Sequence, residues 1–153
     1  MLVLQVKRIN DQTTVEWETP NGQHAEHHEL TACPDVPKEE FLDIMETVEA
    51  DLVARTGFGA KFAAGFKLTG IQVSRNAAGR RQFVPTVKVN FGWGETGAAM
   101  SILLEPDEEG KRTTGKNVLT ANELKNIEHF LEMGGKYADG ERHQGGLKLE
   151  ETG

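Results

Sequence analysis

The longest segment in which apolar residues alternate with residues of mixed character runs from Phe83 to Trp93. Side chains on a strand point alternately to opposite faces, so this segment is predicted to be a strand with one apolar and one mixed face. The odd, apolar positions are Phe83, Pro85, Val87, Val89, Phe91 and Trp93. Pro85 has no N–H to donate, which places the strand at a sheet edge or in a bulge. We expect the rest of the sheet and both helices to be arranged around the apolar face.

Shorter alternations before this segment predict three strands, over residues 2–9, 13–19 and 23–31. Asn10-Asp11 separates the first two and is a turn signal. Pro20-Asn21-Gly22 separates the next two, and Asn-Gly tolerates the positive φ angles of tight hairpin turns. These signals predict a three-stranded meander.

The apolar spacing changes to that of a helix between Pro37 and about Arg55. The apolar positions are Phe41, Ile44, Met45, Val48, Leu52 and Val53. Asp35 is the predicted N-cap and Pro37 fits the first helical turn. Two glycines, Gly57 and Gly59, are predicted to end the helix. Its acidic positions, Glu39, Glu40, Glu46, Glu49 and Asp51, are predicted to form a solvated outer face.

A second set of strands is predicted over residues 66–73, 83–93 and 98–105. In the first of these the apolar phase slips near Gly70, which predicts a bulge there. Residues 106–117 are polar and are predicted to form an exposed connection. The set therefore forms a second meander.

The last helix is predicted over residues 120–138. Thr120 and Glu123 have the spacing of a capping box, and Leu119 and Leu124 that of a hydrophobic staple. The predicted buried stripe is Leu124, Ile127, Phe130, Leu131 and Tyr137. Gly140 is predicted to stop the helix, and residues 141–153 to form a flexible C-terminal tail.

This element order predicts an α+β fold in which two antiparallel β-meanders are each followed by a helix (βββα-βββα). The expected architecture has two layers, with both helices on one face of the sheet. Residues 1–140 are predicted to form a single domain. The two βββα halves show no residue-level repeat. The order of elements alone suggests a duplication, and the question stays open.

Composition and charge narrow the function classes. The chain has 153 residues, is 37% hydrophobic and 27% charged, and has a net charge of -7 at pH 7. An acidic balance argues against a nucleic-acid-binding domain, whose affinity comes largely from Lys and Arg, although a local basic patch remains compatible with it. No apolar run reaches the roughly 18 residues of a membrane span, and the N-terminus lacks a signal-peptide pattern. The single Cys33 cannot form an internal disulfide, so a cytoplasmic location is expected.

Histidines at 24, 27 and 28 invite a metal-site interpretation, which strand geometry opposes. On a strand His27 and His28 point to opposite faces, and His24 lies about 13 Å from His28. We therefore expect no metal and no cofactor, and an exposed strand instead. Cys33 has no second cysteine nearby in sequence and is predicted to be a small buried residue. No catalytic signature is present, which favours a non-enzymatic protein and leaves the question open.

Arginines cluster at the turn between the strands over 66–73 and 83–93. Arg guanidinium groups suit phosphates and carboxylates, so a candidate ligand-binding set is Arg75, Arg80, Arg81, Phe91 and Trp93. The alternative is a solvated turn. Trp93 lies about 33 Å from the arginines along an extended strand, so a shared site requires a second subunit. We therefore expect a homo-oligomer, most simply a dimer, which would also protect a sheet edge.

Three features stand together in the C-terminal third of the chain. They are the strand Ile-Leu-Leu-Glu-Pro at 102–106, the capped helix after Leu119, and the segment Gly-Lys-Tyr-Ala-Asp-Gly-Glu-Arg-His-Gln-Gly-Gly-Leu at 135–147. In these features the chain resembles the ends of small accessory proteins encoded by tailed bacteriophages. The resemblance implies a viral protein that acts in the bacterial host cytoplasm. It carries no functional residues over to this chain.

These observations predict a non-enzymatic phage-type accessory protein that binds, and thereby blocks or sequesters, a host component. The partner would be a host defence protein or a small anionic signalling molecule. An acidic surface can occupy a basic site on a protein by electrostatic complementarity. The alternative is a nucleic-acid-associated replication or recombination protein that binds single-stranded DNA through the second meander.

Overall fold

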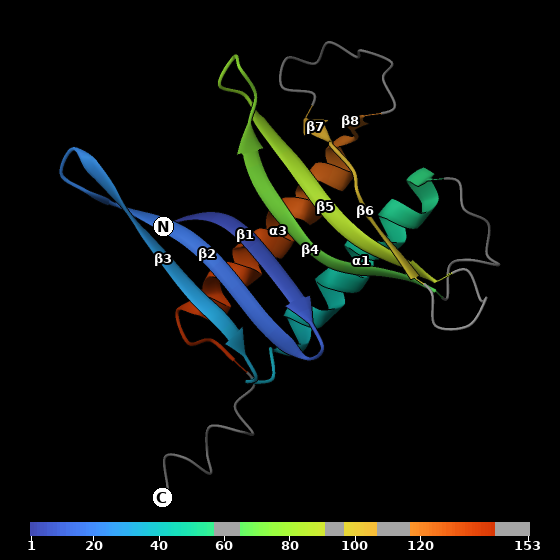
Figure 1. Ribbon diagram of the computed structural model, residues 1–153, viewed down its shortest axis with the longest axis horizontal. Helices are drawn as coiled ribbons and strands as arrows, with labels where there is room; N and C mark the ends of the chain where they lie inside the picture. The colour runs from blue at the N-terminus through green and yellow to red at the C-terminus, as the bar shows by residue number, and fades with distance from the viewer. Residues whose placement is uncertain (57–64, 91–96, 107–116, 143–153) are drawn as a thin grey trace, which may run out of the picture.

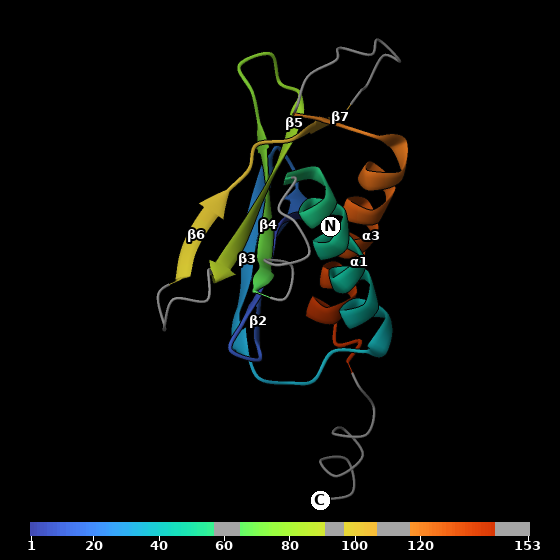
Figure 2. The same ribbon diagram turned by 90° about the vertical axis from the view of Figure 1, so that its right-hand side faces the viewer.

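A computed structural model shows an α+β fold in which a six-stranded antiparallel sheet carries two helices on one face (Figures 1 and 2). The structure describes residues 1–56, 65–90, 97–106 and 117–142. In chain order the elements are β1 (Leu2–Ile9), β2 (Gln12–Asn21), β3 (His24–Cys33), α1 (Glu39–Thr56), β4 (Phe66–Arg75), β5 (Arg81–Asn90), β6 (Gly97–Ser101), β7 (Glu105–Pro106), β8 (Val118–Leu119) and α3 (Ala121–Ala138). No helix among the described residues is long and apolar enough to cross a membrane.

The sheet is built from two three-stranded meanders that meet between their first strands. The strand order is β3-β2-β1-β4-β5-β6. β1 and β4 share three residue pairs, Gln5–Lys7 against Gly70–Gln72. A Cβ atom on Gly70 would lie 2.7 Å from the carbonyl oxygen of Val6, so the close approach of β1 requires a glycine there. The predicted bulge is confirmed, since the β4–β5 register shifts between Leu68 and Gly70.

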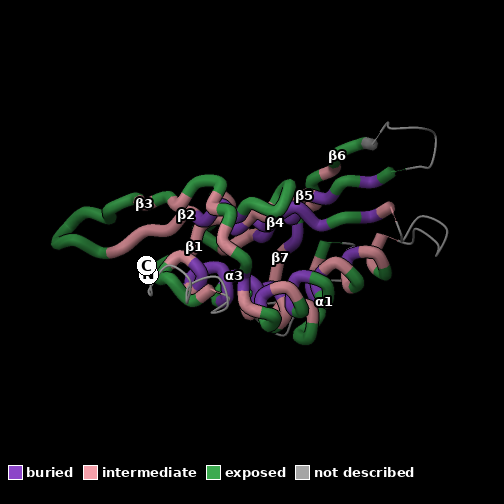
Figure 3. The backbone as a smooth tube through the Cα atoms, turned by 90° about the horizontal axis from the view of Figure 1, so that it is seen from below, coloured by how far each residue is buried: buried purple, intermediate pink, exposed green. Residues whose placement is uncertain are grey.

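Each helix packs on the meander of the other half of the chain. α1 contacts β4, and α3 contacts β1 and β2 (Figure 3). The α3 contact is close because Gly134 lies directly against Val6. On the α1 side, a Glu49 carboxylate oxygen accepts a hydrogen bond from the backbone N–H of Leu68 at 2.8 Å. Glu49 is therefore part of the helix–sheet contact and not of the solvated face predicted for it.

One core fills the space between the sheet and the helices. It contains the predicted apolar face of β5, with Phe83, Val87 and Val89 each 0% exposed. The largest fully buried side chains are Tyr137, Phe41, Phe83, Phe130, Leu52, Leu68, Ile71, Leu104, Val6, Val15, Val48 and Val87. Both predicted helices thus bury most of the apolar stripes that the sequence spacing indicated, with Val53 and Leu124 only partly buried.

Of the two alternatives predicted for Pro85, a sheet edge or a bulge, the edge is wrong, because β5 runs between β4 and β6. The register shift between β4 and β5 lies beside it, opposite Thr86 and Val87. The missing N–H is accommodated where the ladder to β6 is interrupted. β6 pairs as far as Ser101 against Thr86, after which residues 102–103 leave the strand. Pro85 keeps a single bond on that side, its carbonyl oxygen accepting from the N–H of Ile102 at 3.0 Å.

The predicted start of the first helix is also wrong. α1 begins at Glu39, so Asp35 is not its N-cap and Pro37 precedes it. Asp35 instead accepts hydrogen bonds from Tyr137 near the end of α3, through its carbonyl oxygen, and from Arg142 beyond that helix, through its carboxylate. The second helix agrees with prediction, because Thr120 and Glu123 form both hydrogen bonds of a capping box.

The structure contains two short strands before α3 that the predicted element order lacks. β7 and β8 form a two-stranded parallel sheet between the second meander and the helix. The predicted helix stops Gly57 and Gly59, strand residues 91–93 and tail residues 143–153 lie outside the described residues. At the start of that tail, Arg142 is held against α3 and Asp35.

Candidate functional site

The β4–β5 hairpin brings three arginines to one projecting tip (Figure 1). Arg75 and Arg81 are directly opposite partners in the β4–β5 ladder, and Arg80 precedes Arg81 on the turn. The turn is internally bonded, because the Asn76 side-chain oxygen accepts from the backbone N–H groups of Ala78 at 2.9 Å and Arg80 at 3.0 Å. The tip therefore presents its cationic groups from a fixed backbone. We call Arg75, Arg80 and Arg81 the Arg tip.

The guanidinium groups of two of these arginines have few protein partners. Arg75 Nη1 donates to the carbonyl oxygen of Gly79 at 2.7 Å. The Arg81 guanidinium carbon lies 5.3 Å from the centre of the Phe83 ring. Within the described residues neither Arg75 nor Arg81 forms an ion pair with a carboxylate. Like charges directly opposite one another on a strand pair are destabilising, so this pair is not explained by the stability of the hairpin.

The other two predicted ligand residues, Phe91 and Trp93, lie outside the described residues. Asn90, the last described residue before them, is at the far end of β5 from Arg81. The structure therefore brings together the three arginines of the candidate set. A contribution of Phe91 and Trp93 from a second subunit stays a prediction.

The histidine segment forms a strand, as predicted, and its side chains diverge. His27 Nε2 lies 3.4 Å from a carboxylate oxygen of Glu16, while His28 stacks on Trp17 at 5.4 Å between ring centres. The His28 ring also hydrogen bonds to the Thr19 hydroxyl at 2.9 Å. Among the described residues, no three His, Cys, Asp or Glu side chains lie close enough together to hold a metal ion.

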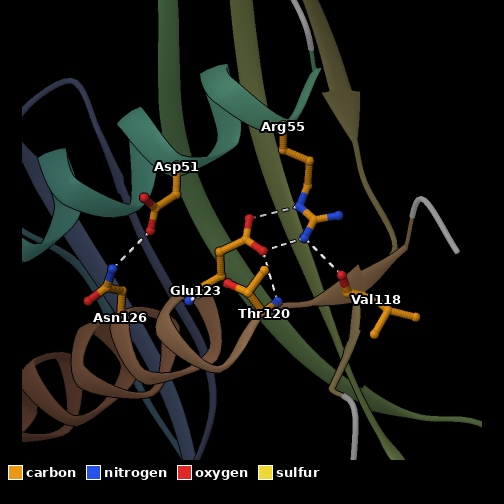
Figure 4. Close-up of polar contacts among 6 residues, drawn as sticks. All are labelled: Asp51, Arg55, Val118, Thr120, Glu123 and Asn126. Atoms are coloured by element: carbon orange, nitrogen blue, oxygen red, sulfur yellow. Dashed lines mark hydrogen bonds and ion pairs between the residues drawn. The ribbon is translucent and has the colours of Figure 1, made fainter. Parts of the chain in front are cut away.

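Sequence reasoning missed a polar network that joins the end of α1 to the start of α3 (Figure 4). Arg55 donates to both carboxylate oxygens of Glu123, through Nε at 2.9 Å and through Nη2, and also to the carbonyl oxygen of Val118. Burial alone would raise the pKa of Glu123, but the hydrogen bonds from Arg55 and from the Thr120 backbone outweigh it and hold the pKa below its usual range. One turn away, Asn126 donates to Asp51 at 2.9 Å.

A shallow hollow of about 560 Å³ lies over this network. Its lining groups are Asp51, Ala54, Arg55, Thr56, Thr120 and Glu123. Glu123 is already engaged by Arg55 and by the capping box, so the carboxylate is committed to holding the helices together. We therefore assign the network a structural role. The Glu123–Thr120 spacing was visible in the sequence, but the partner Arg55 is 68 residues away.

A second buried polar contact fixes the end of α3. The Tyr137 hydroxyl donates to the carbonyl oxygen of Asp35 at 2.6 Å. Arg142 lies over the Tyr137 ring at 4.8 Å and donates to the Asp35 carboxylate at 2.7 Å. Burial raises the pKa of Tyr137 to about 12. The hydroxyl is thus held protonated as a structural donor.

The sheet face away from the helices is polar and its charges are segregated. Lys67 and Lys88 are direct partners on β4 and β5, and both are exposed. On the same face but near the opposite edge of the sheet, Glu16 of β2 is directly opposite Glu29 of β3.

Scans against protein-family models, curated proteins and solved structures gave no match to this chain.

Proposed function

We propose that the chain is a non-enzymatic accessory protein of phage type that acts in the host cytoplasm by binding and sequestering a small anionic signalling molecule. The Arg tip is the binding surface. The observation that carries the proposal is the Arg75–Arg81 cross-strand pair on a hairpin end, with Arg80 beside it, in a protein whose net charge is -7. At the α1–α3 network, by contrast, the Arg55 guanidinium and the Glu123 carboxylate are already bonded to each other.

The chemistry of the tip suits a phosphorylated ligand. Guanidinium groups bind phosphate oxygens through two parallel N–H donors, and such charge-assisted hydrogen bonds are stronger than neutral ones. The bonded turn fixes the backbone before the ligand arrives, which lowers the ordering cost of binding. Binding an anion also relieves the repulsion between the paired arginines. Two or more phosphate groups in one ligand would engage both strands at once.

Calorimetric titration with ATP and, separately, with inorganic pyrophosphate tests the proposal. The Arg80→Ala/Arg81→Ala variant should bind at least about ten-fold more weakly, since each hydrogen bond to a charged group contributes about 1.5–3 kcal/mol. The matched control is Lys125→Ala/Lys136→Ala, which removes the same charge from α3. Equal affinity in the wild type and the arginine variant, with folding intact, would show that the Arg tip is a solvated turn.

Single-stranded DNA is a second candidate ligand, supported by the exposed Lys67–Lys88 pair on the same hairpin. The salt dependence of binding separates the candidates, because contact with several phosphates makes the affinity fall steeply with salt. A Lys67→Ala/Lys88→Ala variant should lose oligonucleotide binding and keep ATP binding if both surfaces act. Binding of a short oligonucleotide that is unaffected by the lysine changes would remove this candidate.

A further inference from the structure

β3 is the outermost strand on one side of the sheet, and its outer edge is open. The sheet order places β2 on its inner side, and no described element lies on its outer side. Figure 3 shows most of β3 exposed, with the β2–β3 hairpin extending away from the helices. The strand is ten residues long, His24–Cys33, and contains neither Lys nor Pro. Those are two of the residue types with which proteins ordinarily block an edge.

The register identifies which backbone groups of this edge are unpaired. Asn21 and His24 flank the two-residue turn at Gly22, where φ is 64°, and such a turn is closed by a hydrogen-bonded pair. In an antiparallel ladder bonded and non-bonded pairs alternate, so Ala25, His27 and Glu29 point their N–H and C=O groups outward. Pro20 is opposite Ala25 and is consistent with this alternation of bonded and non-bonded pairs. In a non-bonded pair the N–H at position 20, which proline lacks, would point away from β3.

The side chains along this edge alternate between potential cations and anions. His27 and Glu29 lie on the open face of the sheet, and Glu26 and His28 on the helix side. When two such strands run antiparallel, outward residues must oppose outward residues. One register that meets this condition sets His27 against Glu29 of the partner subunit. Two-fold symmetry then forms that pair twice, with the axis at His28.

We propose that two copies of the chain associate through β3 in this antiparallel register and join their six-stranded sheets into one continuous sheet. The unpaired backbone groups at Ala25, His27 and Glu29 supply the ladder, and the paired His27 and Glu29 side chains fix its register. This assigns self-association to β3 and not to β5, which lies inside the sheet.

The two histidines at the centre of this edge have different neighbours. His27 faces Glu16 and Glu18 of β2, while His28 faces the Trp17 ring, Thr19 and, at 3.6 Å, Glu26 of its own strand. In the proposed register each His27 is directly opposite a Glu29 of the other copy, so the open face of the joint contains histidine–glutamate pairs and no directly opposed carboxylates.

Sedimentation equilibrium of the full chain at neutral pH tests the proposal. We expect a mass of twice 16.8 kDa. Ala25→Pro removes an outward N–H and leaves the β2–β3 hydrogen bonds in place, so it should abolish the dimer without loss of fold, as checked by circular dichroism. A dimer that persists in Ala25→Pro would overturn the proposal.

A charge exchange tests the register. His27→Glu sets carboxylates opposite each other and should prevent association, whereas His27→Glu/Glu29→His restores the opposite pairing and should recover the dimer. Failure of the double variant to recover it, with folding intact, would refute this register. A monomer that binds a Lys-rich strand-forming peptide would assign the edge to a basic partner and not to a second copy.

Discussion

Two adjacent glycines of α3 should respond oppositely to the same substitution. Gly134 and Gly135 are both buried on the face that packs against β1. A Cβ atom at Gly134 would lie 2.2 Å and 2.9 Å from the two Cγ atoms of Val6, a side chain that is 0% exposed. A Cβ atom at Gly135 would lie 3.1 Å from the sulfur of Met1 and 3.2 Å from a methyl of Val3. Met1 is flexible and half exposed, so it can move aside.

The magnitude follows from two opposing terms. Replacing glycine with alanine inside a helix gains about 0.8–1.0 kcal/mol of helix propensity at either position. Overpacking a core costs about 1–3 kcal/mol, and Val6 has no solvent-filled space into which to retreat. Because the propensity gain is common to both variants, their difference isolates the clash. We expect Gly134→Ala to be about 1–3 kcal/mol less stable than Gly135→Ala.

Urea unfolding followed by circular dichroism measures this difference. With an m-value of about 1–3 kcal/mol/M, the two midpoints should differ by about 1 M. Adding Val6→Ala removes both clashing methyl groups, so Gly134→Ala should cost less in that background than in the wild type. The reasoning fails if Gly134→Ala proves as stable as Gly135→Ala, since α3 would then not lie as close to β1 as the structure places it.

Two further predictions concern the buried polar contacts. Glu123→Gln should lower the free energy of unfolding by about 1–2 kcal/mol at pH 7. The pKa of Glu123 is lowered in the folded protein. The difference in unfolding free energy between wild type and variant should therefore persist at pH values above the ordinary pKa of glutamate and shrink as the pH falls below about 4. Urea unfolding at pH 7, 5 and 3 would reveal this. Tyr137→Phe should cost about 1–2 kcal/mol at pH 7, because it leaves the Asp35 carbonyl without its donor. The pKa of Tyr137 is raised to about 12 in the folded protein, so the contribution of its hydroxyl to the free energy of unfolding should be complete below pH 10 and lost as the pH rises toward 12. The phenylalanine variant should not show this loss in alkaline unfolding.

Local chemistry made the elements predictable. The capping box at Thr120 and Glu123, the phase slip at Gly70 and the turn at Asn10-Asp11 each involve residues close in sequence. Asn10 and Asp11 indeed adopt positive φ angles of 53° and 61°. The Arg tip could also be predicted, because the Asn76–Gly79 turn joins neighbouring strands and brings its flanking residues together whatever the rest of the sheet does.

Contacts between residues far apart in the chain could not be predicted from the sequence in the same way. For Pro85 the sequence leaves a choice between an edge and a bulge, because it shows a missing donor and not the neighbour that stops pairing beside it. Asp35 has the chemistry of an N-cap, yet its carboxylate is used by Arg142, 107 residues later. The position of β3 at the edge follows from β1 meeting β4, a contact between residues more than 60 positions apart with no signature in either segment.

The crossed packing of the helices sets the order in which the chain can complete its fold during synthesis. β1, β2 and β3 emerge from the ribosome first, but the apolar side chains Val6 and Val15 are covered by α3, which is made last. The contact between Gly134 and Val6 closes a loop of well over 100 residues, so the entropy of closing that loop is lost only after α3 has been made. Until then the first meander exposes one apolar face and one open edge to its surroundings, the form in which strands pair with the wrong neighbour. The nascent chain is therefore at its most vulnerable while the second meander is being translated, and a chaperone that covers Val6 and Val15 would have to leave before α3 can dock.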